Sequence, residues 1–516
     1  MATDPLQPID SWNAITARHL LNRAGFGGPS ERLASLAKQS PEEAVAFFVD
    51  YNNQPDKLPP ANFVVPPRDP QELKAIMAAL TPEERQKKNS EYQRAEREAI
   101  QELKAWWLER MHKSDRPLEE KLTLFWHGHF ATSAQKVRSS HQTHAMNAVL
   151  RKHAAGNVKQ LTIDVGQSPS MLRYLDNAKS TKKQPNENWA RELMELFTLG
   201  QGQYSETDIK ESARAFTGWT SDYQKFVYRY EYHDTGEKVF MGRRGALDGW
   251  DIIDVIFEQP AAATFIAGKL WSFFAYDDPE PEIVAALANT LRASDYELRP
   301  MLRQMFLSRA FYSEKAIARQ VKSPTQFAVQ LAFDMRYDDA PYAAMARATQ
   351  SIGQDLFYPP NVKGWDGNLA WVNANAMLIR YNLPQSLLVA NAANDKKKAR
   401  PAMTPEGDPK MTDGEAMSEP AMQGEMKPAP AAAEPEAWNA QEFFLSLGFT
   451  TPNECVSKLA EHFLSVPLSA EQRQVLLAAL APVAGPDARM TRKNVNPRNL
   501  IAATHLLLST AEYQLC

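Results

Sequence analysis

Two carboxylates interrupt the apolar face of a stretch that the sequence pattern predicts to be helical. In residues 186–200 (Asn-Glu-Asn-Trp-Ala-Arg-Glu-Leu-Met-Glu-Leu-Phe-Thr-Leu-Gly), apolar residues recur at helical spacing and form one arc of the helix surface. Glu192 falls inside that arc, and Glu195 and Asn188 fall at its edge. A buried carboxylate is costly unless it is paired, hydrogen-bonded or bound to a metal, so we expect a partner group to face this edge.

Histidines are concentrated in one short part of the chain. Four of the 10 histidines lie within eighteen residues, and they are His127, His129, His141 and His144. The apolar stripe of residues 117–130 places His129 on the inward face of a helix, and His127 then points away from that face. Paired histidines occur in zinc and iron sites, but they also serve as buried hydrogen-bonding groups, and both interpretations remain open.

A third group follows a run of alternating aromatic residues. His233 and Asp234 stand where the alternation of residues 226–232 ends, before a Thr-Gly-Glu turn. The two side chains could act as an acid/base pair or as two metal ligands. The competing interpretation is structural, because aspartate often caps turns and histidine can stack on a tyrosine ring.

Together these residues support a hydrolase hypothesis. Glu192, His129 and Glu195 are the candidate catalytic residues, and the candidate ligands of a divalent metal are His127, His129, Glu192, His233 and Asp234. In such a site the metal or a buried carboxylate activates water and a histidine relays the proton. The alternative is a noncatalytic accessory or scaffold protein with a protein partner, in which the buried acids pair with Arg23, Arg191 or Arg214.

The elements that would position these groups are almost entirely helical. Repeated apolar periodicity and capping patterns such as Ser40-Pro-Glu-Glu and Thr81-Pro-Glu-Glu predict an all-α, multi-helix bundle with one small β-hairpin near 226–241. We expect a main helical domain over 1–390, with the hairpin as an insertion at 220–250. A disordered linker rich in Pro, Ala and Met is expected over 391–437, and a C-terminal helical segment over 438–516 is expected to pack on the main domain.

Composition excludes several classes of protein. The net charge of -4 gives no global field for nucleic acid binding, and the two cysteines, Cys455 and Cys516, cannot form a disulfide framework. The sequence contains no apolar run long enough for a membrane span and no secretory signal pattern, so a cytoplasmic location is the default expectation.

Several motifs resemble those of the bacterial Domain of Unknown Function 1800 family. They are His19-Leu-Leu-Asn-Arg-Ala-Gly-Phe-Gly, Trp126-His-Gly-His-Phe, residues 186–200, His233-Asp-Thr-Gly-Glu-Lys, Lys322-Ser-Pro-Thr-Gln-Phe and Pro360-Asn-Val-Lys-Gly-Trp. These motifs are distributed over nearly the whole chain outside the linker. The resemblance implies a mostly helical bacterial protein, and it supplies no activity, substrate or catalytic residue.

Overall fold

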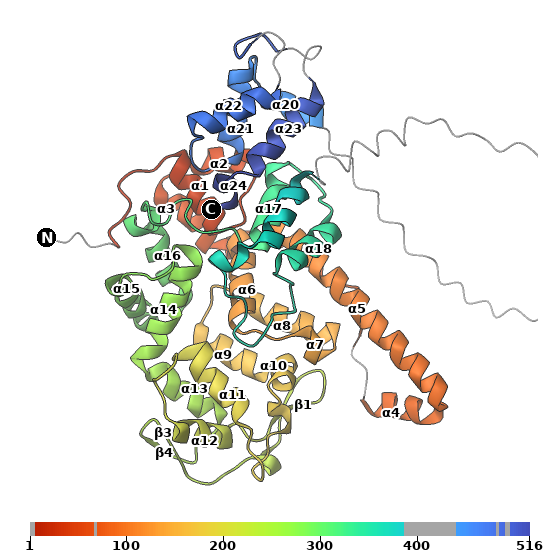
Figure 1. Ribbon diagram of the computed structural model, residues 1–516. Coiled ribbons are helices and arrows are strands. Elements are labelled where there is room, and N and C mark those ends of the chain that lie inside the picture. The colour runs from red at the N-terminus through yellow and green to blue at the C-terminus, as the bar shows by residue number, and fades with distance from the viewer. Residues whose placement is uncertain (1–5, 67–69, 386–439, 481–484, 491–495) are drawn as a thin grey trace, which may run out of the picture.

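The computed structural model describes residues 6–66, 70–385, 440–480, 485–490 and 496–516. Its architecture is mainly helical with two very small antiparallel sheets, so the predicted fold class is confirmed (Figure 1). The predicted linker over 391–437 lies outside the described residues. None of the described helices combines the length and apolarity that a bilayer span requires.

The helices follow one another through short connections. The first are α1 (Ala14–Arg23), α2 (Ser30–Leu36), α3 (Pro41–Val49), the 3-10 turn η1 (Tyr51–Asn53), α4 (Pro70–Ala79) and α5 (Pro82–Lys113). Next come α6 (Pro117–His129), α7 (Ala134–Val137), α8 (Ser140–Lys152), α9 (Val158–Gln167), α10 (Pro169–Tyr174), η2 (Asn177–Lys179), α11 (Glu187–Glu192), the π-helix η3 (Leu193–Thr198) and α12 (Glu206–Ala215).

The second half of the chain begins with the strands. They are β1 (Trp219–Ser221), β2 (Phe226–Tyr228), β3 (Lys238–Phe240) and β4 (Arg243–Gly245), with the turn η4 (Tyr230–Tyr232) between the two pairs. The helices after them are α13 (Gly249–Glu258), α14 (Pro260–Phe274), α15 (Pro281–Ala293), α16 (Leu298–Leu307), η5 (Arg309–Tyr312), α17 (Pro324–Asp334), α18 (Tyr342–Ile352) and η6 (Asn368–Trp371). The C-terminal helices are α20 (Ala440–Ser446), α21 (Pro452–Phe463), α22 (Ala470–Leu480), α23 (Pro497–Leu508) and α24 (Ala511–Gln514).

Capping boxes begin α3 and α5 at the residues predicted from the sequence. The Ser40 hydroxyl accepts a hydrogen bond from the Glu43 amide while the Glu43 carboxylate accepts one from the Ser40 amide. Thr81 and Glu84 form the same reciprocal capping box. α5 begins beside α4 at a point away from the body and runs toward it, and its buried residues lie in its C-terminal half (Figure 1).

The strand pairing differs from the single hairpin predicted between 226–232 and 238–241. β2 pairs with the preceding β1, in the register Thr220 opposite Val227, and β3 pairs with the following β4. The Asp222 carboxylate accepts hydrogen bonds from the amides of Gln224 and Lys225, which closes the tight β1–β2 turn. The alternating tyrosines after β2 enter the η4 turn, so they do not continue the strand.

The C-terminal helices share an apolar core with the main helical body. Phe327 and Leu331 of α17 pack in one cluster with Leu459 of α21 and Leu507 of α23. Polar contacts accompany this packing, because the Arg18 guanidinium donates to the carbonyls of Glu461 and His462. These helices lie at the opposite end of the molecule from α12 and the strands (Figure 1).

Candidate functional site

The carboxylate-bearing helix changes its pitch at the point where the sequence placed Glu192 in the core. α11 ends at Glu192 and continues as a π-helix over Leu193–Thr198, in which the Leu199 amide donates to the Met194 carbonyl over five residues. The wider turn invalidates the spacing of about 100° per residue used for the prediction. Asn188 and Glu192 lie in α11, before the wider turn, where Glu192 is half-buried and Asn188 is exposed.

The two glutamates make surface contacts with their own neighbourhood. Glu195 accepts hydrogen bonds from the Gln201 carboxamide at 2.9 Å and from the Tyr204 hydroxyl at 3.0 Å. Burial raises the pKa of Glu192, the charge of Glu195 adds to that rise, and Arg191 opposes it.

His129 supports the end of the π-helix. Its Nε2 lies 2.9 Å from the Phe197 carbonyl oxygen, and because that oxygen can only accept, Nε2 carries the proton. Burial lowers the pKa of His129 to about 4, with the Phe197 carbonyl opposing and Lys269 reinforcing the shift. The imidazole is therefore neutral at physiological pH and its Nδ1 holds a free lone pair.

His127 has the opposite tautomer. The Phe357 amide donates to His127 Nε2 at 3.0 Å, so the proton of the neutral ring is on Nδ1. Burial lowers the pKa of His127 to about 3. Its one lone pair is occupied by the backbone, which leaves the ring no acceptor for a metal or a proton.

His233 and Asp234 also have nearby structural partners. His233 Nδ1 lies 3.0 Å from the Thr217 carbonyl oxygen, to which it donates. Asp234 accepts two hydrogen bonds from the Arg214 guanidinium, at 2.8 and 3.2 Å, and these bonds are the main cause of its lowered pKa. This pairing is the one that the scaffold hypothesis proposes for Arg214.

The candidate metal ligands do not meet in one place. Across the described parts of the chain, no group of three or more His, Cys, Asp or Glu side chains is arranged to hold a metal ion. His127, His129, Glu195, His233 and Asp234 instead contact their own local partners. Among them, His129 alone lines one of the described cavities treated below.

A cavity of about 620 Å³ opens beside His129, and we call it the Arg23 cavity. Its walls come from α1, α6, η3, α14, the start of α17 and the loop before η6. Five of the six motifs that carry the family resemblance each contribute a lining residue, and these residues are Arg23, His129, Leu196, Gln326 and Lys363. The volume falls in the range of small-molecule sites.

Two buried cations and a thiol line the inner part of this cavity. Arg23 donates to the carbonyls of Phe274 at 2.7 Å and Phe273 at 2.8 Å, and to the Cys516 sulfur at 3.0 Å. The Lys121 ammonium donates to the Gln326 carboxamide oxygen. Within the described residues neither cation forms an ion pair with a carboxylate.

These charges change the acidity of the cavity groups. Burial alone would raise the pKa of the Cys516 thiol, but the charges of Arg23, Lys121 and Lys322 outweigh it and hold that pKa below its usual value. Burial lowers the pKa of Lys121 to about 7, with Cys516 opposing and Arg23 reinforcing the shift. The same cluster of charges therefore favours the thiolate form of Cys516, while burial makes Lys121 a weaker base than an exposed lysine.

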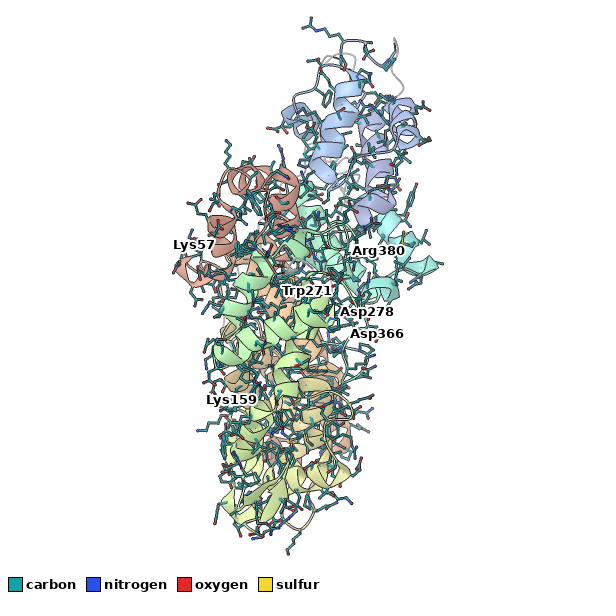
Figure 2. The ribbon with its side chains drawn as sticks, turned by 90° about the vertical axis from the view of Figure 1, so that its left-hand side faces the viewer. Lys57, Lys159, Trp271, Asp278, Asp366 and Arg380 are labelled. Carbon is teal, nitrogen blue, oxygen red and sulfur yellow. The ribbon has the colours of Figure 1, made fainter. Side chains whose placement is uncertain are left out.

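Further polar groups complete the cavity. The Thr325 amide donates to the Gln354 Oε1 at 2.9 Å, which fixes that carboxamide and leaves its Nε2 as a hydrogen-bond donor. Exposed carboxylates lie at the rim, where Figure 2 shows Asp278 and Asp366 at one edge of the molecule. Asp366 pairs with Lys363 at 2.9 Å.

Sequence reasoning identified His129 and missed the rest of this cavity. Arg23 and Cys516 are separated by 493 residues, and no motif links them. A usable signal was present in the sequence, because Arg23 and Lys121 stand at positions of apolar helical stretches, where a buried cation needs an anion nearby.

The comparison with protein families agrees with the motifs. The model of the family described as "Protein of unknown function (DUF1800)" matches residues 19–515. The chain therefore belongs to the Domain of Unknown Function 1800 family. No curated protein and no solved structure matches the chain significantly.

Proposed function

We propose that this member of the family is a hydrolase of small anionic acyl compounds that works in the Arg23 cavity. The observation that supports this proposal is the pair of buried cations, Arg23 and Lys121, which face the cavity without a carboxylate partner in the described chain. Two buried positive charges with one thiol between them favour an additional anion. The proposed reaction is still hydrolysis, as in the hypothesis drawn from the sequence, but Cys516 and Lys121 replace Glu192 and Glu195 as the reacting residues.

Substrate binding in this proposal uses charge and hydrogen-bond donors. Arg23 and Lys121 attract the anionic group, and Gln354 Nε2 donates to a substrate oxygen. Phe125 and Phe265 supply apolar walls on either side of His129. The cavity therefore suits a short acid with an apolar stem.

The chemical step begins with the Cys516 thiolate. The sulfur attacks the acyl carbon, a C–S bond forms, and the bond from that carbon to the leaving group breaks. The Lys121 ammonium, with a pKa of about 7, gives a proton to the leaving group and becomes a neutral amine. Water then attacks the thioester, its proton returns to Lys121, and the acid and the thiolate are released. His129 Nδ1 accepts a hydrogen bond from that water.

The other predicted site residues stay predictions without a shared site. Glu195, His127, His233 and Asp234 have local contacts that a structural role explains, and Glu192 is half-buried away from the cavity. The second candidate function, a noncatalytic scaffold with a protein partner, is favoured by one observation. The Arg214–Asp234 pair and its Glu211 partner form a network that binds the strands to α12.

The test compares two esters of 4-nitrophenol that differ in charge. The hemisuccinate carries a carboxylate on the acyl chain and the butyrate does not. We expect hydrolysis of the hemisuccinate to be faster by at least about tenfold, which corresponds to about 1.4 kcal/mol of transition-state binding. Mass spectrometry of the quenched reaction should show the acyl group on Cys516.

The other cysteine of the chain, Cys455, provides a matched control for Cys516. Cys516→Ser should abolish hydrolysis, whereas Cys455→Ser should leave it unchanged, because Cys455 is buried within the C-terminal core. Full activity in Cys516→Ser, or equal rates for the two esters, would contradict the proposal. Absence of hydrolysis together with no binding of succinate by calorimetry would leave the scaffold function as the better account.

A further inference from the structure

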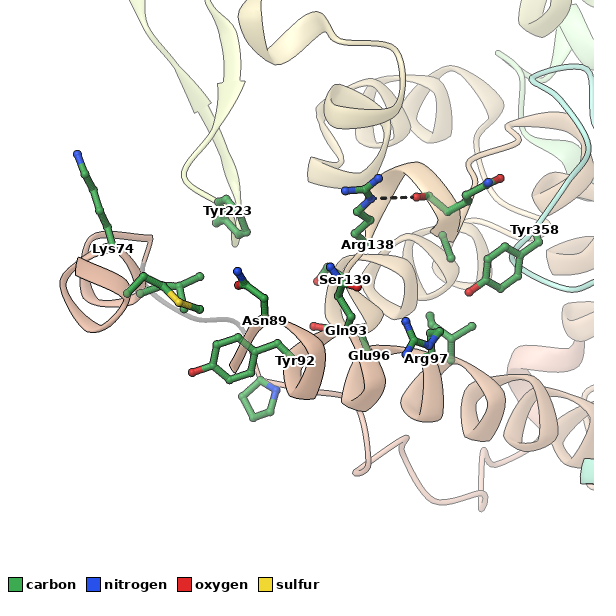
Figure 3. Close-up of a pocket in the computed structure, with 16 residues that line it drawn as sticks. Lys74, Asn89, Tyr92, Gln93, Glu96, Arg97, Arg138, Ser139, Tyr223 and Tyr358 are labelled. Atoms are coloured by element: carbon green, nitrogen blue, oxygen red, sulfur yellow. Dashed lines mark hydrogen bonds between the residues drawn. The ribbon is translucent and has the colours of Figure 1, made fainter. Parts of the chain in front are cut away.

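Two further cavities lie apart from the Arg23 cavity, where the β1–β2 turn approaches α5. One cavity, of about 780 Å³, is lined by α4, α5 and α7 (Figure 3). The other, of about 500 Å³, is lined by α7, α10 and η2. Arg138 and Tyr223 line both cavities, so the two adjoin, and we call them together the Tyr223 groove.

The groove is cationic although the chain as a whole is acidic. It is lined by six cationic side chains and two carboxylates, and the cations are Lys74, Arg97, Lys136, Arg138, Arg173 and Lys179. Both carboxylates have partners, since Glu96 accepts from the Ser140 amide at 2.6 Å and Asp176 pairs with Lys136 at 2.6 Å. With a chain net charge of -4, this local surplus points to an anionic ligand.

Two arginines stand beside the tyrosine at the junction. Arg138 donates to the Gln135 carbonyl, and the Arg173 guanidinium lies 5.8 Å from the Tyr223 ring. Within the described residues neither arginine forms an ion pair with a carboxylate. Both are therefore available to a ligand group.

The backbone at the junction is held in an unfavourable conformation. Arg138 has φ of 53° and Tyr223 has φ of 82°, both in the left-handed region that costs a residue with a side chain about 1–3 kcal/mol. The Gln142 carboxamide donates to the Tyr223 carbonyl at 2.8 Å and holds the turn there. In this conformation the Tyr223 side chain lies opposite Tyr92 and Asn89 of α5 (Figure 3).

The larger cavity is mainly apolar. Aromatic faces come from Tyr92, Tyr223 and Tyr358, and aliphatic side chains come from Met77 and Ile100. The cations of the smaller cavity lie at the other end of the groove, beyond Tyr223. A ligand that satisfies both ends has an apolar body and an anionic head.

We propose that the Tyr223 groove binds a soluble, elongated amphipathic carboxylate, with its apolar chain against α5 and its carboxylate between Arg138 and Arg173. This site is separate from the Arg23 cavity and does not depend on the proposed hydrolysis. Single-stranded nucleic acid also combines stacking faces with negative charge. The apolar lining favours the carboxylate, and the experiment distinguishes the two.

The experiment titrates the full-length protein with 11-(dansylamino)undecanoic acid and follows dansyl fluorescence. Palmitate should displace the probe, whereas hexadecanol, which has the same chain without the charge, and oligothymidylate should not. The double variant Arg138→Gln/Arg173→Gln should weaken binding by at least about tenfold, and the control Arg94→Gln on α5 should have no effect, because Arg94 is exposed and pairs with Glu98.

A second variant distinguishes the loss of a ligand contact from misfolding. Tyr223→Gly removes the ring and relieves the positive φ, so the protein should stay folded by circular dichroism while probe binding falls. Equal displacement by hexadecanol, or unchanged binding in the double variant, would overturn the proposal. Displacement by oligothymidylate that the double variant abolishes would overturn it in favour of nucleic acid.

Discussion

Arg23 and Cys516, 493 residues apart in the chain, are joined by a hydrogen bond of 3.0 Å from the guanidinium to the sulfur. Both side chains are buried, and the same guanidinium holds the carbonyls at the end of α14. The bond therefore connects the first helix, the middle of the chain and the C-terminal segment at a single charged group. Its direction, from a permanent cation to sulfur, favours the thiolate.

The first prediction concerns the reactivity of the two cysteines. Cys516 should be alkylated by iodoacetamide at neutral pH, because neighbouring cations lower its pKa and it lines a cavity. Cys455 should stay unmodified in the native protein, since burial raises its pKa to about 12. Lys121→Met removes one charge at similar volume, so the pH midpoint of Cys516 alkylation should rise. An unchanged midpoint would show that Lys121 does not act on the thiol.

The second prediction concerns two glycines of the cavity loop. Both Gly364 and Gly367 have positive φ, at 85° and 77°, but a Cβ on Gly364 would overlap the Gly128 carbonyl, whereas one on Gly367 meets no atom within 4 Å. Gly364→Ala should therefore cost about 1–3 kcal/mol more in unfolding free energy than Gly367→Ala. Urea denaturation of the two variants measures this difference, and equal losses would contradict the close approach.

The third prediction follows from the low pKa of buried histidine. His127 titrates near 6.5 in the unfolded chain and, because of burial, near 3 in the fold. The unfolded state thus binds more protons, and stability present above pH 6.5 is lost as the pH falls from 6.5 toward 3. His127→Gln should reduce the pH dependence of unfolding free energy in this window by up to about 1.4 kcal/mol per pH unit.

The comparison with wild type is needed because several buried or half-buried carboxyls act in the opposite sense. Burial raises the pKa of Glu119 to about 7 and that of Asp334 to about 6, so their contributions fall as the pH rises. They are present in both proteins and cancel in the difference. Urea denaturation midpoints between pH 4 and 7 give the slopes, and identical slopes would contradict a neutral, buried His127.

The fourth prediction concerns Glu120, which is fully buried. It accepts hydrogen bonds from Trp107 at 2.9 Å, from Arg110 at 2.9 Å and from Arg151 at 2.8 and 3.0 Å. Glu120→Gln leaves Arg151 without its counterion and Arg110 with Asp56 as its remaining carboxylate partner, and should cost about 3–5 kcal/mol. The control Glu98→Gln breaks the exposed pair with Arg94 and should cost no more than about 1 kcal/mol. Thermal denaturation of both variants measures the contrast.

Local interactions account for the features that could be predicted from the sequence. The capping boxes at Ser40 and Thr81 depend on residues three positions apart, so the pattern alone predicts them. The helical class follows from apolar spacing. The π-helix at 193–198 could not be predicted in this way, because the apolar spacing was interpreted with the pitch of a regular α-helix, and the His129 contact with the Phe197 carbonyl joins residues far apart in the sequence.

The candidate site depends on contacts that no spacing rule describes. The density of histidines in the sequence suggested a metal site. In the structure His127 accepts a hydrogen bond from the Phe357 amide, and His129 donates one to the Phe197 carbonyl. The charged part of the cavity joins Arg23, Lys121 and Cys516, whose distances along the chain exceed any local motif. The strands could not be paired from the sequence either, because the alternation at 226–232 predicts a strand but does not show that its partner is the preceding strand β1.

The sequence separation of Arg23 and Cys516 has a consequence for biosynthesis. At roughly 5–20 residues per second, a ribosome needs on the order of 25–100 s to make the segment between them. During that interval the growing chain holds Arg23 and Lys121 without the thiol that faces them in the finished protein. The hydrogen bond from Arg23 to the sulfur therefore forms only after the segment between them has been made, and the inner part of the cavity is completed when Cys516 meets the helices that hold Arg23 and Lys121.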